Sequence, residues 1–220
     1  MMNKRVVLLC GHYGSGKTNI AVNLAQAIKR EYLTVTLADL DIVNPYFRSK
    51  DSATELEEAG IRLICSNYAN SNVDIPALPP DLYALTDDRR MKAIIDVGGD
   101  DRGALVLGRL APAILAENDY EMLMVINCYR PLTRDAASTL EVMREIESAG
   151  GIRFTALINN SNLGVETTAE DVLASMRYAD EVAAMSGLPV VMTTADENLQ
   201  EELKDKIPTL FPLKLQKKIQ

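Results

Sequence analysis

The chain has 220 residues, of which 47% are hydrophobic and 25% charged, and its 31 acidic and 23 basic side chains give a formal net charge of −8. This length and composition predict one soluble domain, spanning residues 1–220, with a substantial core, and two small domains are the alternative. The acidic balance argues against nucleic-acid binding over the whole surface. No apolar run reaches the ~18 residues of a membrane-spanning helix, so we expect no membrane span.

The three cysteines, Cys10, Cys65 and Cys128, are far apart in the sequence and form no C-x-x-C pair. Such sparse, odd usage is typical of a reducing compartment, so we expect a cytoplasmic protein. The basic and apolar start of the chain runs into a glycine-rich loop rather than a cleavage site. We therefore expect a first strand at this position instead of a signal peptide.

Short apolar runs alternate with helix-length segments along the whole chain. Several of these runs are continuously apolar, which is typical of strands buried on both faces of a parallel sheet. The order predicts an α/β fold of three layers, α/β/α, around a mostly parallel sheet, with ligands at the carboxyl ends of the strands. A capping box at Thr168 and Asp171 predicts the start of one helix. The predicted strands are 5–10, 33–38, 61–65, 92–97, 121–127, 152–158 and 189–193.

The first predicted strand ends in a loop that reads G-x-x-x-x-G-K-T, and a helical pattern begins at its end. This is the P-loop pattern, in which backbone N–H groups and a helix N-terminus surround phosphate groups. It predicts the P-loop NTPase fold. Lys17 is expected to reach the β- and γ-phosphates, and the Thr18 hydroxyl is expected to bind Mg²⁺. The nucleotide-binding residues predicted in this segment are Gly11, His12, Gly14, Ser15, Gly16, Lys17, Thr18 and Asn19.

Acidic side chains follow two later strands. The segment TLADLDIVNPYF puts Asp39 and Asp41 at the end of the second predicted strand, and AIIDVGGDDRG puts Asp96 at the end of the fourth. An apolar strand that ends in aspartate is the Walker B pattern, whose carboxylate holds Mg²⁺. The glycine pair that follows, ending at Gly99, lets the backbone approach a γ-phosphate. We predict Asp39 and Asp96, together with Thr18, as the metal ligands.

These motifs resemble the deviant Walker A ATPases of the SIMIBI class, which include ParA, MinD, the nitrogenase iron protein and CooC-type nickel-insertion ATPases. In that family an Asp-x-Asp pair follows the second strand, and D-x-x-G follows the Walker B strand. Asp39 with Asp41, and Asp96 with Gly99, match these positions. The resemblance implies ATP as the nucleotide and a role for Asp41 in positioning the attacking water.

The same resemblance implies an asparagine after a later strand that reads adenine. The segment ALINN ends a predicted strand, and Asn159 is the matching residue. Asn159 or Asn160 as a simple turn former is the alternative. The sequence contains no N-K-x-D guanine motif, which favours ATP over GTP.

The sequence departs from the family at the signature lysine, whose position is occupied by His12, the only histidine. In the family, this lysine reaches the phosphates of the other subunit across an ATP-bridged dimer. An imidazole is mostly neutral near pH 7. Nucleotide binding is still expected, whereas the support for a nucleotide-dependent homodimer activated by its partner is weaker. Three arginines in predicted edge loops, each either a substitute cation or a solvated side chain, are Arg48, Arg102 and Arg130.

The C-terminal segment FPLKLQKKIQ combines apolar and basic residues, as the membrane-binding tails of MinD-like proteins do. Here Pro212 interrupts the segment, and its apolar residues fit neither the helical nor the strand period. We therefore expect a packed or frayed tail and no membrane binding.

The sequence predicts an Mg²⁺-dependent ATP-binding protein and slow ATPase that acts as a nucleotide-controlled switch on an unidentified partner protein. Lys17 and Asp41 are the predicted catalytic residues. Two alternatives on the same fold stay open. One is an ATP-dependent small-molecule enzyme similar to dethiobiotin synthetase, and the other is a non-catalytic nucleotide sensor.

Overall fold

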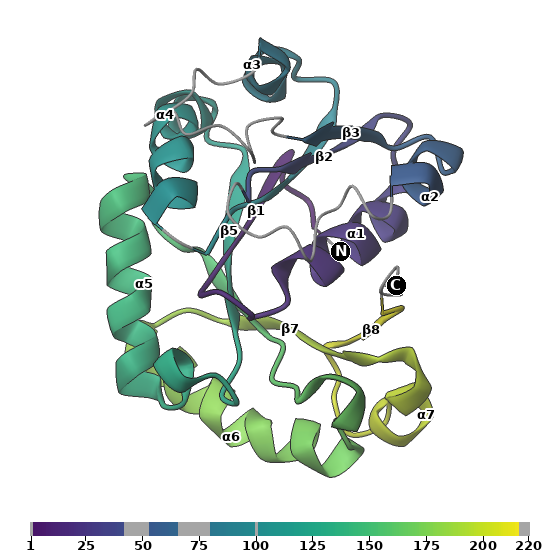
Figure 1. The fold of residues 1–220 in the computed structure, drawn as a ribbon, viewed down its shortest axis with the longest axis vertical. Coiled ribbons are helices and arrows are strands. Elements are labelled where there is room, and N and C mark those ends of the chain that lie inside the picture. The colour runs from purple at the N-terminus through teal and green to yellow at the C-terminus, as the bar shows by residue number, and fades with distance from the viewer. Residues whose placement is uncertain (1, 42–52, 66–79, 100, 216–220) are drawn as a thin grey trace.

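The computed structural model describes residues 2–41, 53–65, 80–99 and 101–215, and only the backbone of residues 80, 101, 102 and 104. The strands form one sheet in the order β3-β2-β4-β1-β5-β6-β7-β8, and each neighbouring pair is parallel (Figure 1). The strands are β1 (Val6–Cys10), β2 (Val35–Asp39), β3 (Arg62–Cys65), β4 (Lys92–Asp96), β5 (Tyr120–Ile126), β6 (Ala156–Asn159), β7 (Val190–Asp196) and β8 (Leu210–Leu213).

Helices cover both faces of this sheet (Figure 1). Along β1, Val6 and Leu8 pack into the core on the side of α3 to α6, while Val7 and Leu9 pack on the side of α1 and α2. All four side chains are buried, so the continuous apolar run did indicate a strand covered on both faces. The predicted three-layer α/β/α fold is confirmed. The helices are α1 (Lys17–Lys29), α2 (Ala53–Glu58), α3 (Pro80–Asp87), α4 (Asp101–Glu117), α5 (Ala136–Gly150), α6 (Ala169–Ser186) and α7 (Gln200–Leu203), with short 3₁₀ turns η2 (Pro131–Thr133), η3 (Gly164–Glu166) and η4 (Glu197–Leu199).

The predicted capping box is present at the start of α6. The Thr168 hydroxyl accepts from the backbone N–H of Asp171 at 3.2 Å, and the Asp171 carboxylate accepts from the Thr168 N–H at 2.9 Å. These contacts satisfy N–H groups that the first turn of a helix leaves unpaired. The helix ends at Gly187, whose left-handed φ of 74° suits glycine.

The C-terminal segment forms an edge strand. β8 pairs in parallel with β7, and Phe211 and Leu213 are buried against the sheet. An edge strand tolerates Pro212, because its missing N–H is not needed for a second neighbour. Of the packed or frayed tail that we predicted, residues 211–215 are packed, and the sequence analysis missed the strand itself.

A side chain of α1 binds the backbone at the end of this edge strand. The Asn23 carboxamide donates to the Lys214 carbonyl at 3.0 Å and accepts from the Lys214 N–H at 2.9 Å. The Lys214 ammonium also pairs with Glu55 of α2 at 3.1 Å. The last strand is thus joined to both helices on its side of the sheet.

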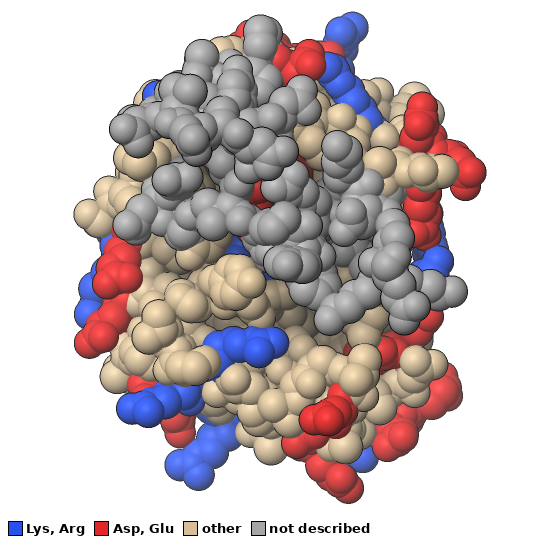
Figure 2. Space-filling model, viewed as in Figure 1, with Lys and Arg blue, Asp and Glu red and all other residues tan. Residues whose placement is uncertain are grey.

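Charged side chains lie mainly around the margin of the face in Figure 2, where acidic groups recur along the right side and lysines and arginines form small separate groups. Within the described ranges, no helix is both long enough and apolar enough to cross a bilayer. Residues 66–79 lie outside the described part of the chain, and α3 begins at Pro80.

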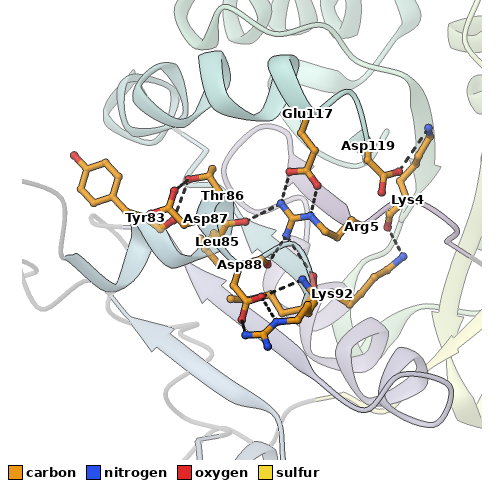
Figure 3. Close-up of polar contacts among 12 residues, drawn as sticks. Lys4, Arg5, Tyr83, Leu85, Thr86, Asp87, Asp88, Lys92, Glu117 and Asp119 are labelled. Atoms are coloured by element: carbon orange, nitrogen blue, oxygen red, sulfur yellow. Dashed lines mark hydrogen bonds and ion pairs between the residues drawn. The ribbon is translucent and has the colours of Figure 1, made fainter.

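A buried arginine joins the amino ends of the strands to the helices beside them (Figure 3). Arg5, only 8% exposed, forms a two-pronged ion pair with Glu117 at the end of α4. Its remaining N–H groups donate to the carbonyls of Leu85, at 2.9 Å, and of Met91 and Asp88. The Arg5 contact also lowers the pKa of the Glu117 carboxyl. By contrast, neighbouring Lys4 pairs with Asp119 at 3.7 Å in an exposed position.

Replacing Arg5 should therefore cost far more stability than replacing Lys4. Arg5→Met keeps an apolar stem but leaves Glu117 buried and unpaired, so we expect a loss of about 3 kcal/mol or more in the free energy of unfolding. Lys4→Met removes an exposed pair and should change it by less than about 0.5 kcal/mol. Urea unfolding followed by circular dichroism measures both values. Equal losses in the two variants would contradict this account.

Candidate functional site

The predicted P-loop connects β1 to α1 at the carboxyl edge of the sheet. Gly16, the N-cap of α1, has a left-handed φ of 89°. A Cβ at this position would lie 2.2 Å from the Asn160 amide nitrogen, so no larger residue fits. The P-loop thus has no room for a side chain at Gly16, and it connects the buried strand β1 to helix α1. β1 lies between β4 and β5, where chain connections leave in opposite directions, and open α/β sheets bind ligands at such points.

Lys17 lies across its own loop. Its side chain is 6% exposed, and the ammonium donates to the carbonyls of Gly11 at 2.9 Å and His12 at 3.2 Å. The positive charge is thereby held at the loop rather than in solvent. The His12 ring is only half-buried, and its Nδ1 lies 3.0 Å from the carbonyl of Tyr13.

The two predicted Walker carboxylates lie on neighbouring strands. Asp39 ends β2 and Asp96 ends β4, and they are direct partners in the parallel register. Both are buried, at 3% and 0% exposure. The Thr18 hydroxyl donates to Asp96 Oδ2 at 2.6 Å, and the Asp41 backbone N–H donates to Asp39 Oδ1 at 3.0 Å. The structure thus brings together Thr18, Asp39 and Asp96, and it places the backbone of Asp41 beside Asp39.

This burial makes Asp96 hard to ionise. Desolvation, followed by the charge of Asp39, raises the pKa of Asp96 to about 7, and Lys17 and the Thr18 hydrogen bond only partly oppose the shift. The other carboxyl oxygen, Oδ1, is buried and has no hydrogen-bond partner among the described residues. Two adjacent carboxylates, one of which has a buried oxygen without a hydrogen-bond partner, are suited to binding a cation.

The donor set matches the way in which proteins hold Mg²⁺. This ion prefers oxygen ligands and usually takes one or two carboxylates, with water and substrate phosphates completing its shell. Thr18, Asp39 and Asp96 offer such oxygens. In the part of the chain that the structure describes, no group of three or more His, Cys, Asp and Glu side chains is arranged to bind a metal by itself. The residues present therefore fit an ion that arrives with phosphate groups.

Gly99 lies directly against the loop. A Cβ added to it would be 2.6 Å from the backbone nitrogen of Tyr13 and 2.9 Å from the Gly11 carbonyl oxygen. Any side chain would push the two backbones apart. The segment after β4 therefore contacts the P-loop through its backbone, while the predicted approach of this backbone to a γ-phosphate stays a prediction.

The two asparagines at the end of β6 point in different directions. Asn159 is fully buried, and its amide donates to the Ser175 hydroxyl of α6 at 2.9 Å. Asn160 instead donates to the Ser15 carbonyl of the P-loop at 2.6 Å, and its own oxygen accepts from the Thr194 hydroxyl of β7. Asn160, the next residue along, is the one that contacts the loop. In this arrangement Asn159 is enclosed by α6, so its predicted contact with adenine requires a rearrangement.

A further buried carboxamide was missed by the sequence analysis. Asn127 follows β5, is 0% exposed, and accepts from the backbone N–H groups of Tyr129 at 3.0 Å and Asn162 at 3.3 Å. It thus joins the loops that follow β5 and β6. The signal was available, because a polar residue directly after an apolar strand is the same pattern that identified Asp39 and Asp96.

Of the three candidate arginines, Arg130 contacts the P-loop, donating from Nε to the Gly14 carbonyl at 2.9 Å. Arg48 lies outside the described residues, and only the backbone of Arg102 is described. Cys10, at the end of β1, is buried, and desolvation raises the pKa of its thiol far above the ordinary value.

A cavity among the described residues lies elsewhere. A hollow of about 630 Å³ is lined by residues at the end of α3 and just after it. These residues precede β4, so the hollow lies at the amino end of that strand, away from the loop and the carboxylates. We place the candidate site at the P-loop, because the buried charges gather there. The lining residues are Tyr83, Ala84, Asp87, Asp88, Arg89 and Arg90.

Solved structures share this fold at low sequence identity. The signal recognition particle receptor FtsY from Elizabethkingia anophelis is 19% identical, with a TM-score of 0.52 over 88% of this chain and 59% of that one. Cell division protein FtsY from Thermotoga maritima is 19% identical, with a TM-score of 0.58 over 90% and 65%. The signal recognition particle 54 kDa protein from Aeropyrum pernix K1, in complex with GDP, is 19% identical, with a TM-score of 0.52 over 87% and 41%.

The chain therefore spans less than two thirds of the length of each of these proteins. No protein-family model and no curated protein matches the sequence. At this level of identity the likeness establishes the fold, which is that of the P-loop NTPases, as predicted.

The raised pKa of Asp96 leads to a prediction about pH. An unfolded aspartate ionises near its ordinary value of 3.8, while the folded protein keeps the Asp96 proton up to about pH 7. Between these values the folded state holds more protons than the unfolded state, so the Asp96 contribution to stability falls as pH rises. Asparagine cannot ionise, so Asp96→Asn removes the cost of a buried negative charge and should stabilise the nucleotide-free protein at pH 8 by about 1–3 kcal/mol.

The difference between variant and parent should shrink toward pH 5, where the parent is protonated. Urea unfolding at pH 5 and pH 8 gives both values. Asp119→Asn, which alters the exposed pair with Lys4, is the control and should change little. If Asp96→Asn is no more stable than the parent at pH 8, burial of the ionised Asp96 carboxylate does not destabilise the fold.

Proposed function

We propose that this protein is an Mg²⁺-dependent ATPase that acts as a nucleotide-controlled switch on a partner protein. The observation that carries the proposal is the Thr18–Asp96 hydrogen bond beside Asp39, at the foot of a P-loop whose Lys17 is held over the loop. Each of these groups is costly to bury, and together they complement a metal-bound triphosphate.

Different residues of the site contact the phosphates, the metal ion and the attacking water. Lys17 neutralises the β- and γ-phosphates, and the N–H groups at the start of α1 add a partial positive charge. Thr18, Asp39 and Asp96 hold Mg²⁺, which offsets phosphate charge when it is bound. Asp41, whose backbone is fixed on the Asp39 carboxylate, positions the attacking water.

We propose ATP rather than GTP because the loop after β6 carries carboxamides. A carboxamide carries donor N–H groups beside an acceptor oxygen, which suits the edge of adenine where an amino group lies beside an acceptor nitrogen. Asn159 and Asn160 are both buried. Asn160 is the better candidate for this contact because it already lies against the P-loop, although its hydrogen bonds to Ser15 and Thr194 would have to be exchanged for it. One fold neighbour carries GDP, so a direct comparison of ATP with GTP is the necessary test of this choice.

Exposed apolar side chains around the site support a protein partner. Tyr13 of the P-loop, Leu132 of η2 and Val165 of η3 are 59%, 55% and 94% exposed. All three belong to loops that follow the carboxyl ends of strands, which is the nucleotide edge. Exposed apolar groups on the loops at a ligand edge are suited to contact with a second protein. Bound nucleotide would then alter the affinity for that protein by moving these loops.

We expect slow basal turnover. His12 stands where the resembling ATPases have a lysine, and its ring contacts only the neighbouring carbonyl of Tyr13 at 3.0 Å among the described residues. A well-placed cation on a transferring phosphoryl group is worth about 10³–10⁵ in rate. A nucleotide-dependent homodimer, if formed, would therefore not depend on a charge from His12.

The direct test is binding and hydrolysis by the full chain. Calorimetry with Mg-ATP and Mg-GTP should give tighter binding of ATP. Lys17→Ala should weaken ATP binding at least about 100-fold, because it removes the only lysine of the loop. Lys29→Ala, at the exposed end of the same helix, is the matched control and should bind like the parent.

A product assay separates the alternatives. Free phosphate alone supports the ATPase, a phosphorylated or ligated small molecule supports a dethiobiotin-synthetase-like enzyme, and binding without turnover supports a sensor. If Lys17→Ala binds ATP like the parent, the assignment of the site is wrong.

Asp41→Asn should keep Mg-ATP binding but slow hydrolysis by about 100-fold, because a positioned base typically contributes 10²–10⁴. Asp119→Asn, at the amino end of β5 and away from the loop, provides the comparison and should hydrolyse like the parent. Phosphate release under single-turnover conditions measures both rates. Parent-like hydrolysis by Asp41→Asn would remove Asp41 from the mechanism.

A further inference from the structure

The tip of the P-loop is covered by an arginine from another loop. Arg130 Nε donates to the Gly14 carbonyl at 2.9 Å. A Cβ built on Gly14 would lie 3.5 Å from Nε, 3.8 Å from Cδ and 3.9 Å from Cζ of this arginine. The planar guanidinium therefore rests on the glycine backbone, and a side chain at position 14 would be in contact with it.

Hydrogen bonds to Asn127 and Thr133 fix the backbone of Arg130. Its N–H donates to the Asn127 carbonyl at 3.2 Å, and its carbonyl accepts from the Thr133 N–H at 3.1 Å. The buried Thr133 hydroxyl also donates to the Asn127 carbonyl at 2.7 Å. Pro131 follows directly and starts η2. The arginine thus projects from a short, hydrogen-bonded turn on the end of β5, so its position is set before any ligand arrives.

Most of the hydrogen-bonding capacity of Arg130 is unused. A guanidinium carries five N–H donors, and only the Nε contact is formed within the described ranges of the chain. Two other arginines, by contrast, have acidic partners. Arg5 is bound by a carboxylate and three carbonyls, and Arg134, in the same loop as Arg130, pairs with Asp135 at 3.4 Å. Arg130 has no acidic partner in the described structure, although it is half-buried.

We infer that Arg130 is a cation of the nucleotide site, whose Nε holds the loop at Gly14 while its terminal N–H groups donate to phosphate oxygens of the bound nucleotide. This inference rests on the proposed nucleotide binding. An arginine fork is suited to phosphate because its geometry matches two oxygens at once. It enters the loop from its own chain, and it brings a permanent charge to a loop in which His12 is mostly neutral.

Three substitutions separate the charge from the contact with Gly14. Arg130→Gln places an amide nitrogen the same number of bonds from Cα as Nε, so it keeps a donor for the Gly14 carbonyl without the charge. Arg130→Lys has a methylene at that position and a charge one bond further on, so it loses the Gly14 contact and keeps the charge. Arg130→Ala loses both. Arg134→Gln, four residues later and exposed, is the matched control.

The probe is Mg-ATP, titrated by calorimetry against the full chain at low and high salt. We expect Arg130→Gln and Arg130→Ala to weaken affinity about 10- to 100-fold, as the loss of a charge-assisted hydrogen bond does. Arg130→Lys should stay closer to the parent, and Arg134→Gln should lie within about twofold of it. The parent should also lose affinity with salt more steeply than Arg130→Gln.

The opposite order, with Arg130→Gln like the parent and Arg130→Lys like Arg130→Ala, would mean that only the carbonyl contact matters and would overturn the inference. Parent-like affinity in Arg130→Gln overturns it as well. Thermal unfolding without nucleotide checks that each variant is folded. If the parent itself binds neither ATP nor GTP, the proposed function fails. If the parent binds and Arg130→Gln is unaffected, only the role of Arg130 fails.

Discussion

Two carboxylates buried side by side impose the main constraint on this molecule. Asp39 and Asp96 end neighbouring strands and are almost completely shielded from water. Like charges in such a position destabilise the fold unless cations or hydrogen bonds compensate them. The compensation comes from the P-loop, through the Thr18 hydroxyl and the nearby charge of Lys17. The loop conformation and the sheet edge are therefore coupled by electrostatics, and a metal–phosphate ligand would complete what the protein supplies only in part.

Two side chains from neighbouring loops also fix the conformation of the P-loop. Arg130 and Asn160 bind the carbonyls of two consecutive residues, Gly14 and Ser15, from the loops after β5 and β6. Across a trans peptide, the carbonyl and the following N–H point in opposite directions. Fixing these carbonyls therefore also fixes the orientation of the next two N–H groups. Such preorganisation lowers the entropy lost when an anion binds.

Most of the fold could be predicted from the sequence because its signals are local. Continuous apolar runs identified the buried strands, and glycine, lysine and aspartate at strand ends identified the loop and the acid pair. The edge strand β8 was missed because it is four residues long and contains Pro212, which a single-sided strand tolerates. Its position beside β7 depends on packing that no local pattern records.

The choice between Asn159 and Asn160 could not be made from the sequence for a different reason. Successive side chains of a strand point to opposite faces, so a shift of one residue exchanges the α6 side for the P-loop side. Two identical residues in a row give no indication of which faces which layer. The contact of Arg130 with Gly14 was likewise invisible, because it joins positions 116 residues apart.

The Asn23 carboxamide gives the far end of the sheet a mechanical connection to the phosphate loop. Asn23 lies within α1, whose first residues are Lys17 and Thr18, and its two hydrogen bonds to Lys214 are both made with backbone. If α1 slides or tilts, it must either break both bonds or displace the end of β8 with it. A small shift at the loop would in that case be transmitted along α1 to β8, the edge strand that lies four positions from β1 in the sheet.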